Sequence, residues 1–524
     1  MTELRDHKGQ SEQLCPTRMM ASGRVCGRPI HSSPEHDEQP VCLMHSKDPT
    51  KDSAEFRAEF DRMLEETERS GLPTDFARFV FPVSDFRNRK FETLCDFREA
   101  IFTRDALFNW STFSSFSSFR DAKFMQRADF SSARFMKEVN FRGTAFPEGA
   151  LFHRATFSRH IDFNAARFSG EVEFEHAVFS ENATFLWSKF AKGALFENSV
   201  FSKKVEFTYA EFLGPVKFKN TEFRHDPELA PGLDFSKVSL QQPELVEFGN
   251  VDLGQALFYE TDISRVDFTL VRWRDRGRSD GPFARRFWQV IGIAGRPAGR
   301  FCLFEEVVNL QRSAGEVNSD LWAPKDTPDE RNFGLIAETY QQLKRNYDAR
   351  GDYWTAGHFH FGEMEMKRLH SSWRLRPLRW LNRNFSLVAL YKYASSYGES
   401  YVRPLAWLAV VLVFFSLLNP MLGFYPSTGL VLNAPGLPCN QVCSLNYWNY
   451  ATFFSANPSE RPAGWFGMLL HSFMTSVSVA GFQKEFRYMP SYPWGRLLAL
   501  LELLLTTTLG GLFALAIRRQ FKRS

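Results

Sequence analysis

The regular spacing of phenylalanine constrains the fold of this chain more than any other feature of its sequence. The rings follow one another at alternating steps of five and six residues, without a miss, from Phe86 to Phe223. Two steps make a period of 11 residues that contains two phenylalanines. On an α-helix of about 3.6 residues per turn, these steps scatter the rings and leave no continuous apolar face. The pattern therefore argues against a helix.

A coil of short strands can use this spacing. If each side takes five or six residues, every phenylalanine points inward at the same place in each turn, and like rings stack into columns. The residue two before each ring also points inward, because side chains alternate along a strand. A consecutive run of these residues is Ala128, Ala133, Val139, Thr144, Ala150 and Ala155. The sequence thus predicts a β-solenoid, with about 22 residues per coil if a coil has four sides, and outward charges such as Arg134 and Glu138.

Several units of this ladder share one pattern: ADFSS, ARFMK, ATFSR and AEFLG all read A-x-F-x-x. They resemble the unit of the pentapeptide-repeat family, A-x-[L/F]-x-x. The resemblance covers residues 72–275 and implies a right-handed, four-sided β-helix. The extra residue in every second unit departs from the family, and strict fives return only at Val246–Leu270. The resemblance gives no activity by itself, because such repeats are commonly scaffolds or binding rods.

Residues 1–50 contain a candidate metal site. Its residues are Cys15, Cys26, Cys42 and His45, spaced C-x10-C-x15-C-x2-H. Three thiolates and an imidazole suit tetrahedral Zn²⁺, and the C-x2-H pair can chelate from one turn. The segment has almost no apolar core, so a metal would supply its folding energy. It resembles small bacterial zinc knuckles, C…G-x-x-C…C-x-x-H, and four protein ligands predict a structural zinc. The alternative is a disordered tail with incidental cysteines.

Three further segments are expected between this site and the membrane region. Residues 51–71 are predicted to be a helical linker. Residues 276–333 carry Gly, Arg, Asp and Pro without a clear period and are expected to be a linker with short elements. Residues 334–400 are expected to hold a helical hairpin followed by a basic segment.

The hairpin prediction rests on helical spacing and a break. The spaced residues are Ile336, Tyr340, Leu343 and Tyr347. Arg350–Asp352 interrupts the run, and Asp352 can cap a second helix. His358 and His360 lie near Glu363 and Glu365, but two histidines at i and i+2 of a helix point nearly opposite ways. We therefore expect a solvated face there and no metal site.

Lys367–Tyr397 is basic and contains no acid. Its basic residues are Lys367, Arg368, Arg374, Arg376, Arg379, Arg383 and Lys392, and Trp and Leu are interleaved with them. Such a segment just before a membrane helix is typical of an interface with anionic lipid. The alternative is a basic surface of a soluble domain.

Two apolar runs near the end, Leu405–Tyr425 and Trp494–Ile517, reach the length of about 20 residues that spans a bilayer. The alternative is two buried helices of a soluble domain. Basic residues precede the first run and follow the second, so both termini are expected in the cytosol, with residues 425–493 outside a cell membrane. The polar residues 1–14 contain no signal-like run, in keeping with this topology.

Residues 401–524 contain a pore-like arrangement. A short apolar segment, Trp465–Gly481, lies between the two apolar runs and ends in Ser, Thr and Gly. Non-helical backbone at membrane depth is tolerated where it is buried in protein or lines a water path. The runs SFMTSVSVAGF (Ser472–Phe482) and GRLLALLELLLTTTLGGLFALAIRR (Gly495–Arg519) resemble the two-transmembrane potassium-channel-like pore domain. The resemblance implies a homo-tetramer whose four loops meet at one axis.

The filter region departs from that family. The family filter reads T-V-G-[YF]-G followed by Asp, whereas this chain has SVAGF followed by Gln483. Ala cannot adopt the left-handed conformations that Gly adopts, so the resemblance does not extend to potassium selectivity. The predicted pore and filter residues are Thr475, Ser476, Ser478, Val479, Ala480, Gly481, Phe482 and Glu502.

Two details of the membrane region have open alternatives. Glu502 is an acid at membrane depth and so a functional candidate, but it can equally be a helix-packing or filter-supporting carboxyl. Cys439 and Cys443 lie in the outside connection, where they form either a disulfide or two free thiols.

These features lead to two function hypotheses. The first is an ion channel, selective for cations, whose cytosolic solenoid senses a partner or ligand. The second is a membrane-anchored pentapeptide-repeat scaffold without conductance. The chain has no phosphate-binding Gly-Lys loop, no G-x-S-x-G and no suitable Cys–His pair, so no enzyme is predicted. A net charge of +4 is too small to indicate a nucleic-acid partner.

Overall fold

The protein was analysed as a computed structural model, in which the chain forms two compact units. One unit comprises Met1–Arg276 with Phe301–Gly351, and the other comprises Gly277–Arg300 with Asp352–Ser524. The structure describes residues 14–20, 23–31, 36–224, 231–275, 300–313, 329–370, 376–422, 424–426, 464–480, 488–490 and 493–523.

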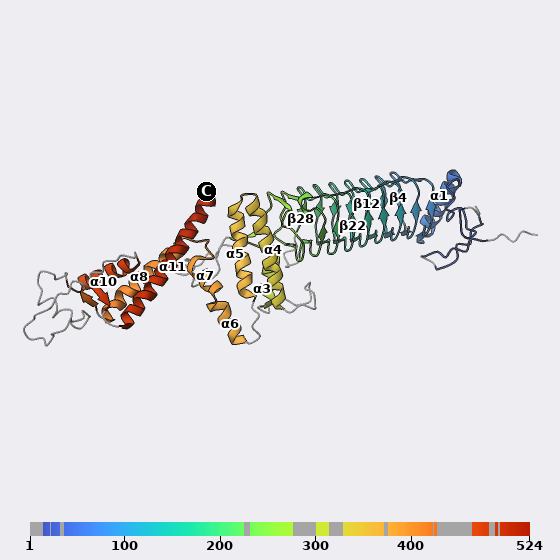
Figure 1. Ribbon diagram of the computed structural model, residues 1–524. Helices are drawn as coiled ribbons and strands as arrows, with labels where there is room; N and C mark the ends of the chain where they lie inside the picture. Colours follow the sequence, from blue (N-terminus) through green and yellow to red (C-terminus); the bar gives the residue numbers. More distant parts are fainter. Residues whose placement is uncertain are drawn as a thin grey trace, which may run out of the picture. The chain divides into compact units, whose positions relative to one another are not determined.

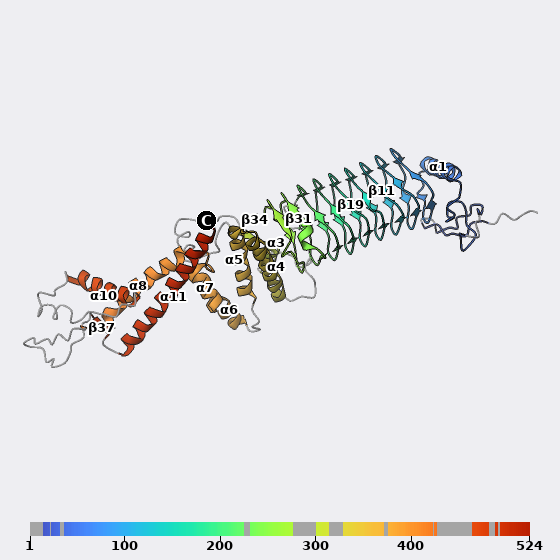
Figure 2. The same ribbon diagram turned by 45° about the horizontal axis from the view of Figure 1, so that its top comes forward.

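The first unit contains a four-sided solenoid of very short parallel strands (Figures 1 and 2). Four sheets of nine, eight, nine and seven strands run along it, from β1 (Thr74–Asp75) to β33 (Asp267–Thr269). Up to β31, each strand pairs with the strand four places before it, as β17 (Ile161–Asp162) does with β13 (Val139–Asn140). The last two pairs, β29 with β32 and β31 with β33, join strands three and two places apart. The register joins Val139 to Ile161, which is 22 residues on. The four-sided coil and its length are thereby confirmed, and its right hand stays a prediction.

The phenylalanines form the core of the solenoid. Every ring of the ladder from Phe86 to Phe223 is at most 5% exposed. Rings one coil apart stack face to face, as Phe119 does with Phe97 at 4.8 Å and with Phe141 at 4.9 Å between ring centroids. The predicted inward residues two before the rings are buried as well, and Arg134 and Glu138 are exposed.

The corners of the coil explain why the steps alternate between five and six residues. In each five-residue step, the residue two after the phenylalanine has a positive φ, as in Ser132 (57°), Ala165 (56°) and Trp187 (59°). A left-handed residue with a side chain costs about 1 kcal/mol. Among the described six-residue steps of the ladder, only the one containing Gly149 has a residue with positive φ. The sixth residue therefore lets two of the four corners turn without this cost.

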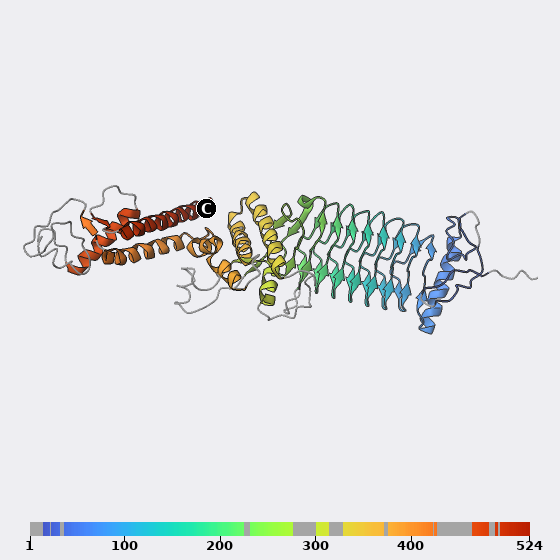
Figure 3. The same ribbon diagram turned by 60° about the horizontal axis from the view of Figure 1, so that its bottom comes forward.

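The N-terminal end of the solenoid is covered by α1 (Ser53–Ser70), which lies across the first coil (Figure 3). Asp52 caps the helix by accepting hydrogen bonds from the N–H groups of Ala54 and Glu55. The Phe60 ring stacks on Phe76 of the first coil at 4.5 Å. The segment predicted as a helical linker is thus a helix that covers the end of the core.

The C-terminal end is covered by α3 (Phe304–Ser313) and α4 (Asp329–Ala349). The Phe301–Cys302 strand β35 and α3 lie within the predicted linker 276–333. All four spaced residues of α4 predicted from the sequence are buried: Ile336, Tyr340, Leu343 and Tyr347. Helix α4 ends at Ala349, before the predicted break, where Gly351 has a φ of 79°.

The second unit is helical. Its described elements are α5 (Tyr353–Leu369), α6 (Arg376–Phe385), α7 (Leu387–Ser395), α8 (Val402–Leu422), β36 (Phe424–Pro426), α10 (Gly464–Ala480), β37 (Tyr488–Pro490) and α11 (Pro493–Arg523). Asp352 caps α5 as predicted, because its carboxylate accepts a hydrogen bond from Thr355 N at 3.0 Å. Helix α8 packs against both α10 and α11. Strand β36, which follows α8, pairs with β37, which precedes α11.

Candidate metal centre and membrane segment

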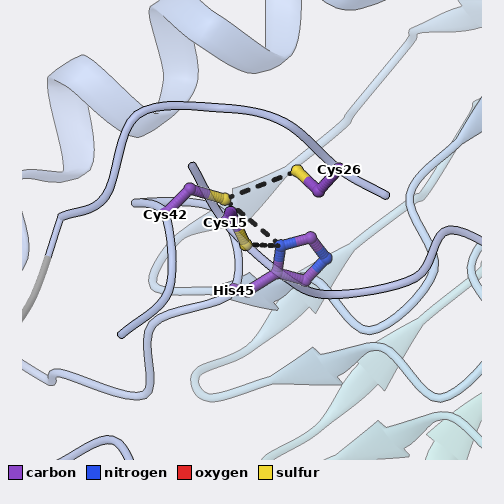
Figure 4. Close-up of side chains that lie close together, drawn as sticks. All are labelled: Cys15, Cys26, Cys42 and His45. Carbon is purple, nitrogen blue, oxygen red and sulfur yellow. Dashed lines mark hydrogen bonds between the residues drawn. The ribbon is translucent and has the colours of Figure 1, made fainter. Parts of the chain in front are cut away.

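The structure brings the four predicted metal ligands together (Figure 4). The sulfurs of Cys15, Cys26 and Cys42 and a ring nitrogen of His45 all lie within 4.8 Å of one another. The Cys26 and Cys42 sulfurs are 3.8 Å apart, and His45 Nδ1 is 3.2 Å from the Cys42 sulfur and 3.6 Å from that of Cys15. A zinc tetrahedron with Zn–S bonds of about 2.3 Å has edges of about 3.8 Å between sulfurs. The side chains therefore fit a tetrahedral metal of this size.

Local backbone geometry positions these ligands. Cys15 and Cys26 lie on two antiparallel segments, and Cys15 N donates a hydrogen bond to Arg28 O at 2.8 Å. Gly27, with a φ of 66°, turns the backbone immediately after Cys26. His45 N donates to Cys42 O at 3.0 Å, so the C-x2-H pair occupies a single turn, as predicted.

The environment of the cluster favours the thiolate form of Cys26. Arg28 Nη1 is 3.2 Å from the Cys26 sulfur, and the hydrogen bond with Cys42, followed by those with His45 and Arg28, lowers the pKa of Cys26. The same hydrogen bond with Cys26, together with burial, raises the pKa of Cys42. The other ring nitrogen of His45, Nε2, is 3.3 Å from Ala77 O, which fixes the tautomer that leaves Nδ1 free to bind a metal. Such outer partners are typical of histidine ligands.

The cluster is joined directly to the first coil of the solenoid. Val80 N donates to Met44 O at 2.8 Å, inside the C-x2-H turn, and the His45 ring meets the Phe79 ring edge to face at 5.1 Å. Lys51 is buried, and its ammonium donates to Leu43 O, Ser46 O and Val80 O at 3.0, 2.8 and 2.5 Å. Burial lowers the pKa of Lys51 to about 8. Sequence reasoning missed this lysine, because KDSAEFR reads as a solvated stretch.

Two helices of the second unit are long and apolar enough to cross a membrane, within Val402–Asn419 and Leu497–Arg519. Only 22% of each stretch is buried within the chain. Core helices of a soluble domain would be largely covered, so this exposure favours lipid contact over that alternative.

Helix α10 is held against α8 by polar side chains. Ser472 Oγ donates to Ser416 O at 2.6 Å, and Asn419 Nδ2 donates to Ser476 Oγ at 3.3 Å. Glu502 of α11 is fully buried and faces Asn419 and Ser476. Three helices thus contribute to one buried polar cluster within a single chain, but neither carboxylate oxygen of Glu502 forms a hydrogen bond with a described residue. Both roles predicted for Glu502 therefore stay open.

The other residues predicted to line a pore or filter lie either in α10 or outside the described residues. Thr475, Ser478, Val479 and Ala480 belong to α10, which is helical up to Ala480. Ser478 Oγ donates back to Met474 O at 2.8 Å. Gly481, Phe482 and the predicted disulfide cysteines Cys439 and Cys443 lie outside the described residues.

The basic segment before α8 differs from the sequence interpretation. Glu363 and Glu365, expected on a solvated face, are both buried. Lys367 is 2.6 Å from Glu363, and Glu365 contacts Arg368 at 2.8 Å and Lys392 at 3.0 Å. Burial alone would raise the pKa of Glu365, but the hydrogen bond from Arg368 and the charge of Lys392 lower it overall. Part of the predicted basic charge is therefore paired with acids of α5.

The same glutamate links α5 to the membrane helices. Tyr397 OH donates to Glu365 at 3.0 Å, and Arg519 of α11 donates to the backbone carbonyl of Tyr397 at 3.0 Å. Ser396, Tyr397 and Gly398 all have positive φ values, 55°, 61° and 79°. A buried turn with several hydrogen bonds thus connects α5, α7 and the C-terminal end of α11.

Comparison with known proteins gave no match: no family model, no curated protein and no solved structure matches this chain.

Proposed function

We propose that this protein is an oligomeric ion channel, selective for cations, that carries its repeat solenoid on the cytosolic side. The observation that carries the proposal is α10. This helix has 17 residues, about 26 Å, which is shorter than the roughly 30 Å hydrocarbon core, and it packs on two helices of spanning length. A short apolar helix in this position suits a re-entrant pore segment.

One face of α10 supports the oligomer. Leu470, Phe473, Met474 and Val477 form a stripe at helical spacing, and all four are exposed. The opposite face carries Ser472 and Ser476 and packs on α8. We propose that a second copy of the chain covers the stripe, in a tetramer as the family resemblance implies.

The turn around Tyr397 supports coupling between α5 and the proposed membrane helices. Because Glu365 and Arg519 both bond to Tyr397, a movement of α5 can reach the end of α11 through two hydrogen bonds. The metal centre is proposed to be a structural zinc that closes the N-terminal end of the solenoid and takes no part in conduction.

One observation favours the second candidate, a membrane-anchored scaffold without conductance. Ser478, Val479 and Ala480 have helical backbone, and helical carbonyls point along the axis toward the C-terminus and not sideways into a pore. A filter of extended backbone is expected in the pore family that this region resembles.

Current through planar bilayers tests the proposal. Purified full-length protein in asymmetric KCl and NaCl should give discrete conductance, and the reversal potential names the ion. Gly481→Leu should abolish it, whereas Val410→Leu on the exposed face of α8 should leave it unchanged.

Cross-linking separates a closed channel from a tether. Met474→Cys should form disulfide-linked copies in membranes, and Val413→Cys on the exposed face of α8 should do so far less. Absence of current together with absence of Met474→Cys cross-links would support the tether and contradict the channel.

A further inference from the structure

Two aromatic rings stack on the outside of the solenoid. Trp187 and Tyr209 occupy equivalent five-residue corners of consecutive coils, and both have positive φ. Their rings are 4.2 Å apart and inclined by 8°. Trp187 is 64% exposed and Tyr209 38% exposed, although most aromatic side chains of the solenoid are buried. This exposed pair does not contribute to the core.

The stack is closed at one end. Lys237 follows Tyr209 at the same corner of the next coil, and its ammonium lies 5.3 Å from the Tyr209 ring centroid and 3.1 Å from the hydroxyl. No further ring can therefore stack on that face of Tyr209. The face of Trp187 that points away from Tyr209 is the remaining end of the stack.

This open face of the Trp187 ring is directed toward two preceding corners of the solenoid, whose residues have almost no side chain. The preceding corners carry Ala165 and then Gly143, which are joined to the neighbouring coils through Ala165 N to Leu186 O and Gly143 N to Asn164 O. Successive coils are about 4.8 Å apart, so the space above Ala165, next to Trp187, matches one more ring of the stack.

The far side of this space is closed by Asp121. A Cβ at Gly143 would lie 2.2 Å from Asp121 Oδ1, so that carboxylate reaches over the glycine, where it is paired with Arg120 at 3.2 Å. The gap between Trp187 and Asp121 thus has a defined length, and Ala165 and Gly143 form its apolar base.

Two arginines flank the gap without a carboxylate partner. Arg142 directly precedes Gly143, and Arg167 follows Ala165 by two residues on β18 (Arg167–Phe168). Both are exposed, and neither forms an ion pair with any residue that the structure describes. Lys189, the neighbour of Arg167 in the sheet, is by contrast paired with Glu211 at 2.9 Å. The charge available at the gap is therefore positive.

We propose that the open face of Trp187, together with Arg142 and Arg167, binds a nucleoside phosphate. The base would continue the Trp187–Tyr209 stack above Ala165, since every base offers a flat π-face to an aromatic side chain. A guanidinium fork matches the oxygens of a phosphate, so Arg167 and Arg142 would bind the anionic end. The space holds one stacked base and ends at Asp121, which favours a mononucleotide over a nucleic-acid strand.

This site would be the ligand-sensing part of the proposed function and so rests on it, but binding is measured without any current. Isothermal titration of full-length protein in detergent would use AMP and GMP as probes, with inorganic phosphate and adenosine as partial ligands. We expect binding of at least one nucleotide, and at least tenfold weaker binding of adenosine and of phosphate.

Variants test the assignment of residues. Trp187→Ala and Arg167→Gln should each weaken nucleotide binding at least tenfold, and Trp187→Phe should restore most of it. Trp110→Ala is the matched control, because Trp110 is also an exposed tryptophan at a positive-φ corner (63°), next to Asn88 and Ser132 in place of a second ring. It should leave the affinity unchanged, and unchanged melting curves would show that all variants fold.

Several outcomes would overturn the proposal. They are the absence of nucleotide binding at millimolar concentration, equal binding of phosphate alone, unchanged affinity in Trp187→Ala, and much tighter binding of a single-stranded oligonucleotide than of a mononucleotide. Nucleotide binding in a protein that shows neither current nor Met474→Cys cross-links would support this site and contradict only the channel.

Discussion

Both ends of the solenoid are covered by other segments of the chain, but by different kinds of interaction. Each end exposes strand edges and a column of phenylalanine that must be covered. At the C-terminal end, helix side chains bond to the last coil: Gln342 accepts from Ile263 N at 2.8 Å, and Asn346 donates to Val266 O at 2.7 Å. At the N-terminal end, irregular loops around the Cys–His cluster do this together with Lys51 and α1.

The difference follows from how large an apolar core each covering segment has of its own. Helices α3 and α4 satisfy their own backbone and bury apolar residues such as Ile336 and Leu343, so they can present polar side chains rigidly. The described loops of residues 14–50 bury only a few apolar side chains, such as Met19 and Met44, and a metal bound to four side chains would supply the folding energy that so small a core lacks. The comparison predicts that one end depends on metal and the other does not.

The largest expected effect comes from removing a ligand at the N-terminal end. Cys42→Ser should lower bound zinc from about one per chain to near none, since four ligands are needed for a closed structural site. The loops should then become sensitive to proteases. Metal analysis and limited proteolysis measure both effects.

The control lies at the other end of the solenoid. Cys302 is equally buried, in β35 beside α3, but belongs to no cluster, so Cys302→Ser should keep its zinc. Equal zinc in Cys42→Ser and the unchanged protein would refute the metal centre.

A smaller effect is expected from removing one polar side chain at each end. Lys51→Met leaves the carbonyls of Leu43, Ser46 and Val80 without their buried donor and should cost about 2–3 kcal/mol of stability, because a buried polar group without a partner keeps its desolvation penalty. Asn346→Ala removes one of two donors from the carbonyls of Ile263 and Val266, which still accept from Val266 N and Arg350, so it should cost only about 1 kcal/mol. Denaturant melts with and without a chelator measure this. Only the Lys51→Met effect should change with the chelator; the same dependence at Asn346 would contradict the comparison.

The smallest effect concerns pH at the C-terminal end. Burial raises the pKa of Glu305 to about 7 from its usual 4.5, even though the carboxylate accepts from Phe258 N at 2.6 Å. A raised pKa means that the protonated form is favoured on folding, so this stability is complete below about pH 4.5 and is lost as the pH rises through 7. Glu305→Gln keeps the acceptor and should flatten the melting temperature between pH 5 and about 8. An unchanged pH profile would show that Glu305 is ionised throughout.

The sequence predicted the solenoid because its signal is local and repeated. The Phe spacing predicted a solenoid, the resemblance to pentapeptide repeats implied its four sides and so the coil length, and the Cys and His spacing predicted a ligand set that the structure brings together. The left-handed corners were missed, since residues as different as Ser132 and Trp187 occupy them.

The contacts that cover the ends could not be predicted, because they join residues far apart with no period. His45 Nε2 contacts Ala77 O, and the Glu305 carboxylate accepts a hydrogen bond from Phe258 N. Glu365 was expected to be solvated because its partners Lys392 and Tyr397 follow it by 27 and 32 residues. In the membrane unit, a short helix was expected between the spanning helices, and the helical backbone of Ser478–Ala480 was not.

Hydrogen–deuterium exchange on the full-length protein, with and without a zinc chelator, tests the central claim most directly. Amides of the first coil that bond to the N-terminal loops, such as Val80, should lose protection when the metal is removed, and those bonded to α3 and α4, such as Phe258 and Ile263, should keep it. Unchanged protection at Val80, or an equal loss at both ends, would contradict a metal-dependent N-terminal end.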